Sequence, residues 1–229
     1  MPTHERTIAI LASGSGSTAE AIIHATQEGS LSAEVGLVIT NKPDAGVLER
    51  VRRLNKEYGL SIEDMVIDSK GKYQAGNVGR GQTLSESEAI CKAISDRGIA
   101  HVALLGYMRI VRGDLMDEYG WKPEYTSSYQ ARMTNTHPGP LPETADTYGL
   151  GTSEKVLALG MLQSRHTFHL VAAGIDTGPI LAEHPVDVLE GDTAEDLFMR
   201  VQGTEKARLA LALDAFLCEQ GEYFGNPRD

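Results

Sequence analysis

The sequence predicts an α/β protein with an open, mostly parallel twisted sheet, helices on both faces and an antiparallel strand pair near the C-terminal third. Short apolar runs rich in β-branched residues alternate with longer runs of helical periodicity, which is typical of strands joined by crossover helices. Two later apolar runs lie close together around a glycine-flanked turn, which favours an antiparallel pair.

The first half of the chain follows this alternation closely. Strands are expected over 7–12, 34–40, 65–68 and 100–106, and helices over 17–28, 44–58 and 84–97. The stretch 70–82 has four glycines and few apolar residues, so we interpret it as an exposed loop.

The second half is less regular. Residues 121–133 are polar and aromatic, and we interpret them as a surface excursion. Strands over 167–171 and 179–183 form the expected antiparallel pair. A long helix begins at Thr193, carries two acidic residues in its first turn and runs to about residue 220.

Composition narrows the classes of partner. The net charge of -11 argues against a nucleic-acid partner. No apolar run approaches the roughly 20 residues that a membrane-spanning helix needs. Cys91 and Cys218 form neither a metal spacing nor a disulfide framework, and the histidines and carboxylates show no metal-ligand spacing. We therefore expect a cytoplasmic protein with no metal and no membrane contact.

The candidate catalytic residues are Asn135, His137 and Asp176. Asn135 and His137 precede a stiff Pro-Gly-Pro turn, and Asp176 stands in a glycine-flanked turn about forty residues later. An amide, an imidazole and a carboxylate together can handle a tetrahedral intermediate at a carbonyl carbon. The amide and imidazole stabilise the oxyanion, and the carboxylate orients or collects a proton. A substrate that brings its own amine needs no protein nucleophile.

A glycine-serine turn between the first strand and the first helix is a candidate phosphate site. Gly14, Gly16, Ser17 and Thr18 place backbone amides at the start of a helix, where they can face an anion. The spacing also fits a loose dinucleotide fingerprint, but no carboxylate ends the second strand, so a small phosphate fits better than NAD. A tight turn without a ligand is the alternative.

The other histidines are weaker candidates. We interpret His101, His166 and His184 as structural or solvent-facing side chains. For His169 two interpretations stay open, a structural or solvent-facing side chain like the others, or a residue that supports the site from behind its candidate catalytic residues.

Taken together, these motifs resemble the glycinamide ribonucleotide formyltransferases, a branch of the folate-dependent formyltransferase superfamily with a Rossmann-like fold. The resemblance covers nearly the whole chain. It rests on residues 11–17, 104–110, 135–142, 176–181, 191–193 and 200–202, and on Val186.

The resemblance implies transfer of a formyl group from 10-formyltetrahydrofolate to the amine of glycinamide ribonucleotide, a step of purine synthesis. Asn135 would hydrogen-bond the oxyanion, and His137 would donate to it in its protonated form. Asp176 would support that protonation and move the proton through water. Glu205, in the last helix, would contact the ribose or glycinamide part of the substrate.

The resemblance also implies a folate pocket and a division of the chain. Residues 1–229 would form one domain, with a nucleotide-binding half over about 1–105 and a folate-binding and catalytic half over about 106–229. The protein would be a monomer or homodimer. Arg109 would lie near the glutamate tail of the folate. The folate-binding residues would be Met108, Arg109, Ile110, Val111, Ala172, Ala173, Gly174 and Ile175.

Three departures from the family pattern bear on the acceptor. Thr18 replaces the usual asparagine, the segment 121–133 is long, and the loop 143–151 is acidic. We expect Glu143 and Asp146 in that loop to border the bound amine. An amino sugar nucleotide is therefore the alternative acceptor, and a non-catalytic folate- or nucleotide-binding module is the alternative class. A formyltetrahydrofolate hydrolase is disfavoured because those enzymes carry an N-terminal regulatory domain, whereas here the first strand begins at Thr7. A tRNA formyltransferase is disfavoured by the negative charge of the chain.

Overall fold

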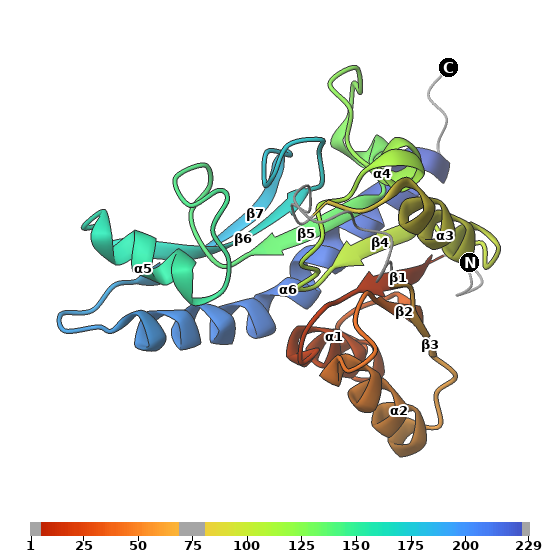
Figure 1. The fold of residues 1–229 in the computed structure, drawn as a ribbon, viewed down its shortest axis with the longest axis horizontal. Helices are drawn as coiled ribbons and strands as arrows, with labels where there is room; N and C mark the ends of the chain where they lie inside the picture. Colours follow the sequence, from red (N-terminus) through yellow and green to blue (C-terminus); the bar gives the residue numbers. More distant parts are fainter. Residues whose placement is uncertain (1–5, 69–80, 226–229) are drawn as a thin grey trace.

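The structure, a computed structural model, describes residues 6–68 and 81–225. Within these residues seven strands form one sheet in the order β3-β2-β1-β4-β5-β6-β7 (Figure 1). β1 to β5 pair in parallel, and β6 is antiparallel to both β5 and β7. The predicted fold class is confirmed. The strands are β1 (Thr7–Leu11), β2 (Glu34–Thr40), β3 (Glu63–Val66), β4 (His101–Leu104), β5 (Met133–His137), β6 (Gln163–Leu170) and β7 (Ile180–Asp187).

Helices cover both faces of the sheet. On β1, Ile8 and Ile10 point to a core shared with α1, α2 and α6, whereas Ala9 and Leu11 point to a core shared with α3 and α4. Within the described residues no helix is both long and apolar enough to cross a bilayer. The helices are α1 (Ser17–Gln27), α2 (Gly46–Tyr58), α3 (Leu84–Ser95), α4 (Gly113–Tyr119), α5 (Leu150–Ala158) and α6 (Ala194–Gly225), with a short 3-10 turn, η2 (Ser128–Gln130).

The C-terminal half contains more regular structure than the sequence predicts. Helices α4 and α5 were not expected, and β6 and β7 are longer than the predicted 167–171 and 179–183. Helix α5 contains Gly151, Thr152 and Ser153, which are weak helix formers, but Thr152, Ser153 and Val156 are buried beneath its neighbours. Tertiary burial therefore stabilises a helix that local propensity does not indicate.

The segment 121–133 is only partly a surface excursion. Ala131 and Met133 are fully buried, and the Gln220 side chain of α6 donates to the carbonyl oxygens of Tyr129 and Ala131 at 3.0 and 2.7 Å. The prediction was wrong for this inner part, because α6 supplies the polar partners that let the backbone be buried.

Most of the predicted exposed loop 70–82 lies outside the described residues. Its final residue, Gln82, is buried and donates from Nε2 to the Tyr107 hydroxyl at 3.1 Å. The loop therefore ends inside the protein, against the segment that follows β4.

Candidate functional site

A cavity of about 220 Å³ opens at the carboxyl ends of the central parallel strands. Strand register aligns Leu11 of β1, Leu104 of β4 and Asn135 of β5 across the sheet. The chain leaves β1 on one side towards β2 and later returns on the other side as β4, so the cavity lies where the strand order reverses. Open α/β sheets bind ligands at such a point.

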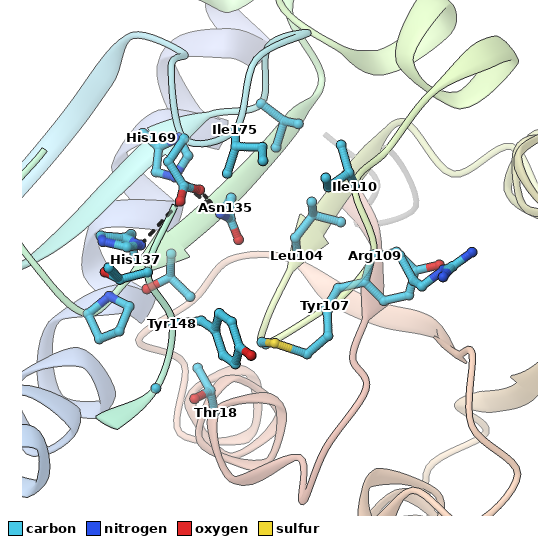
Figure 2. A pocket seen from close by; sticks show the side chains of 18 of the residues that line it. Thr18, Leu104, Tyr107, Arg109, Ile110, Asn135, His137, Tyr148, His169 and Ile175 are labelled. Atoms are coloured by element: carbon cyan, nitrogen blue, oxygen red, sulfur yellow. Dashed lines mark hydrogen bonds and ion pairs between the residues drawn. The ribbon is translucent and has the colours of Figure 1, made fainter. Parts of the chain in front are cut away.

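Asn135, His137 and Asp176 all line this cavity. Figure 2 shows Asn135 and His137 on the same side of it. Asn135 and His137 are alternate residues of β5 and share a face of the sheet. Asp176 comes from the turn between β6 and β7. Asn135 Nδ2 donates to Asp176 Oδ1 at 3.3 Å, and His137 Nδ1 lies 3.4 Å from Asp176 Oδ2. The structure therefore brings the three predicted catalytic side chains together.

Asp176 occupies a backbone conformation that few side chains adopt. Its φ is 51°, in the left-handed region that asparagine and aspartate tolerate best among residues with a side chain. The same turn requires glycine at position 178, because a Cβ there would lie 1.8 Å from the Leu170 carbonyl oxygen. The turn thus folds back on β6 and holds the carboxylate against the end of β5.

His169 is both buried and a neighbour of the catalytic group. Its Nδ1 lies 2.8 Å from the Leu170 carbonyl oxygen, which can only accept, so Nδ1 carries the proton. In the neutral ring Nε2 then accepts from Asn135 Nδ2 at 3.1 Å. His169 and Asp176 thereby fix the orientation of the Asn135 amide, with its NH₂ group turned towards them.

Burial opposes protonation of the His137 imidazole. Loss of solvent lowers the pKa of His137 to about 4, and the nearby Asp176 charge opposes this shift without cancelling it. Burial also lowers the pKa of His169, against the Leu170 hydrogen bond and the Asp176 charge. Burial therefore opposes, and the Asp176 charge favours, the protonated form of His137 that the proposed chemistry uses.

Glu205 of α6 lies buried at another wall of the cavity. Its Oε1 accepts from Thr136 Oγ1 at 3.0 Å and from Thr18 Oγ1 at 3.5 Å, and burial raises the pKa of this carboxyl. His166 Nε2 also lies 2.7 Å from Thr136 Oγ1. Sequence reasoning missed Thr136. The alternation along β5 was the available indication, since it turns Thr136 away from its two neighbours and towards α6.

The glycine-serine turn packs tightly against α2 at Gly16 and leads into the first turn of α1. Gly16 has φ 77°, and a Cβ on it would lie 2.6 Å from the Val47 side chain of α2. Gly14 is exposed with open space around it. Gly16 caps α1 without a side-chain hydrogen bond, so no side chain caps the amides of the first turn. Of the four predicted phosphate residues, Thr18 reaches the cavity lining and Ser17 is half-buried beside it.

The predicted folate residues form two walls of the cavity. Seven of the eight line it, and Ala173 does not. The guanidinium of Arg109 points away from the catalytic group in Figure 2. It donates to the Gly81 carbonyl oxygen at 2.6 Å and to Glu86 Oε2 at 3.1 Å, and burial lowers its pKa. Arg109 thus contributes its stem to the wall, while its charge is bound to a buried carboxylate.

The acidic loop contacts the cavity through different residues from those expected. Glu143 and Asp146 are exposed and lie outside the lining, whereas Thr147, Tyr148 and Gly149 form part of it. The expectation that the two carboxylates border the amine is wrong, because the loop turns them to solvent and buries Thr144 between them. Helix α6 also supplies two lining residues that sequence reasoning missed, Phe198 and Gln202.

Comparisons with known proteins agree with this geometry. The sequence model of the Formyl transferase family matches residues 6–213. A phosphoribosylglycinamide formyltransferase of Bacillus subtilis is 28% identical over 197 residues, which cover 86% of this chain and 87% of that protein. The crystal structure of a phosphoribosylglycinamide formyltransferase from Bacillus halodurans has 31% sequence identity and a TM-score of 0.76, and the match covers 96% of this chain and 100% of that one.

Proposed function

Because the chain belongs to the formyl transferase family, we propose that it transfers a formyl group from 10-formyltetrahydrofolate to the amine of glycinamide ribonucleotide. The observation that carries the proposal is the meeting of Asn135, His137 and Asp176 at the cavity, where Asn135 and His137 each contact the Asp176 carboxylate. The acceptor is that of the phosphoribosylglycinamide formyltransferases to which the chain is similar. A cytoplasmic location is part of the proposal, since both reactants are charged and water-soluble.

The two substrates would approach from different sides. The uncapped amides at the start of α1 would bind the phosphate of the ribonucleotide, and Thr18 and Glu205 would face its ribose or glycinamide part. The folate would lie between residues 108–111 and 172–175. In the proposed division, Thr18 comes from the nucleotide-binding half, and the folate-binding and catalytic half adds Glu205 to the ribonucleotide side.

The reaction would proceed through a tetrahedral intermediate. The substrate amine forms a bond to the formyl carbon, and the bond from that carbon to N10 of the folate then breaks. One proton passes from the amine to N10, through Asp176, water and the imidazole of His137. The 3.3 Å contact of Asn135 with Asp176 is longer than an ordinary hydrogen bond, so it is the one that the amide would exchange for the oxyanion.

The test is turnover of 10-formyltetrahydrofolate by the purified protein with and without glycinamide ribonucleotide. We expect turnover only with the acceptor, and preference for it over an amino sugar nucleotide at equal concentration. Preference for the sugar nucleotide would overturn the acceptor and leave formyl transfer standing. Folate binding without turnover of either acceptor would mean a binding module instead.

A further inference from the structure

Thr144 makes a contact with the catalytic imidazole that the sequence did not predict. It follows β5 in the atypical loop 143–151 and its side chain is fully buried. Its Oγ1 lies 2.9 Å from His137 Nε2 and 2.6 Å from the Pro140 carbonyl oxygen. The hydroxyl therefore has two close neighbours and one proton to share between them.

The contact with Pro140 decides where that proton lies. Two oxygens 2.6 Å apart need a hydrogen between them, and a carbonyl oxygen carries none, so the hydroxyl of Thr144 donates to Pro140. A threonine hydroxyl has a single proton. Towards His137 it can therefore only accept, and the hydrogen of that contact must belong to Nε2.

The other ring nitrogen faces the reaction space. His137 Nδ1 lies 3.4 Å from Asp176 Oδ2, beyond the 2.7–3.2 Å range of N–H···O hydrogen bonds. A neutral ring that is protonated on Nε2 leaves Nδ1 with a free lone pair. The lone pair points to the side where Asp176 lines the cavity.

We infer that Thr144 is a positioning residue that fixes His137 as the Nε2–H tautomer and leaves Nδ1 to gain and lose the proton of the reaction. The assignment of the tautomer rests on the contacts above, and its use in catalysis rests on the proposed function. In that reaction Nδ1 takes the proton that the attacking amine releases. Nδ1 then returns it, through Asp176 and water, to N10 as the carbon–nitrogen bond breaks. A partner that sets which nitrogen of a histidine is protonated is a known way to control its chemistry.

The tautomer can be measured directly by nitrogen NMR on protein with ¹⁵N-labelled histidine. We expect His137 at pH 7 to be protonated on Nε2 and unprotonated on Nδ1, with its signals assigned by their loss in His137→Gln. Thr144→Val keeps the shape of the side chain and removes the acceptor, so the proton should move to Nδ1, facing Asp176. Thr144→Ser keeps the hydroxyl and should keep the Nε2–H tautomer.

Thr152→Val is the matched control. Thr152 is equally buried and packs beside Gly139, and its Oγ1 lies 3.0 Å from Thr147 Oγ1, but no hydrogen bond joins it to His137. Its replacement removes a buried hydroxyl from the same region and should leave the His137 tautomer as in the wild type.

Kinetics add a second readout. Thr144→Val should lower kcat by about 10- to 100-fold, as for other residues that orient a functional histidine, with little change in either KM. Thr144→Ser should restore most of this loss. An Nδ1–H tautomer in the wild type, or an unchanged tautomer in Thr144→Val, would overturn the inference. Absence of formyl transfer by the wild type would overturn the proposed function instead, and the NMR result would still decide the tautomer assignment.

Discussion

Asp176→Asn is the substitution that probes the proposed catalytic group most directly. It preserves the size of the side chain, and asparagine tolerates the left-handed backbone at φ 51° as well as aspartate does. The change removes one negative charge 3.4 Å from His137 Nδ1. Folding should therefore survive, while the support for a protonated imidazole is lost.

The distance sets the scale of the effect. At 3.4 Å and an effective dielectric constant near 20, the carboxylate stabilises an imidazolium by about 5 kcal/mol. The asparagine amide recovers part of this as a hydrogen-bonding dipole. Loss of a general acid–base group costs about 10²- to 10⁴-fold. We therefore expect kcat to fall by about 10²- to 10³-fold, with little change in folate affinity.

The assay is steady-state formyl transfer, with folate binding followed separately by fluorescence. Asp146→Asn is the matched control, because Asp146 also has a positive φ, 69°, but is exposed and lies outside the cavity. It should transfer formyl groups at the wild-type rate. Near-normal turnover by Asp176→Asn would refute the catalytic role and leave Asp176 as a turn residue.

Three further predictions follow from other parts of the structure. Glu205→Gln should raise KM for the ribonucleotide by about 10- to 100-fold, which is the effect expected from losing a hydrogen bond to a charged group. KM for folate should stay unchanged, and an equal rise in both KM values would indicate a general defect. Gly16→Val should destabilise the protein by about 2–4 kcal/mol in urea unfolding, because it combines a positive φ with a clash, whereas Gly14→Ala in open space should not. Burial lowers the pKa of His101 to about 3. As the pH falls below 6.5, this histidine is therefore protonated in the unfolded chain before it is protonated in the folded one. Its contribution to the free energy of unfolding is complete above pH 6.5 and is lost progressively towards pH 3. Between pH 6 and 4 the free energy of unfolding should depend on pH less steeply in His101→Gln than in the wild type, by about 1.4 kcal/mol per pH unit. An unchanged pH dependence would contradict the assignment.

The parts of the fold that depend on local pattern could be predicted from the sequence. The apolar runs of β1, β2 and β4 are buried on both faces, so they read as continuous hydrophobic strands. Their alternation with helical periodicity was enough to predict a parallel sheet. The carboxyl ends of these strands then indicated where a ligand binds. Asn135 and His137 could be placed there because they stand at the carboxyl end of another expected strand.

Features that depend on tertiary burial could not be predicted. Thr144 is one polar residue in a polar loop, and nothing local distinguishes it from its exposed neighbours Glu143 and Asp146. Its burial follows from the way the loop packs against Gly139, where a Cβ would clash with Thr144 itself. The lowered pKa of His137 could not be predicted for a related reason, since the degree of burial that lowers it is a property of the assembled fold.

Helix α6 has a consequence for the order in which the protein becomes active during its synthesis. It supplies Glu205 to the cavity, and it bonds to Thr18, a residue 187 positions earlier in the chain. On the ribosome Asn135, His137 and Asp176 emerge before α6 (Ala194–Gly225). A nascent chain therefore carries its reactive groups without the helix that covers one face of the sheet and completes the site. Because this closure joins distant parts of the chain, it is a slow type of contact to form, and the cavity has its Glu205 wall only after α6 has docked.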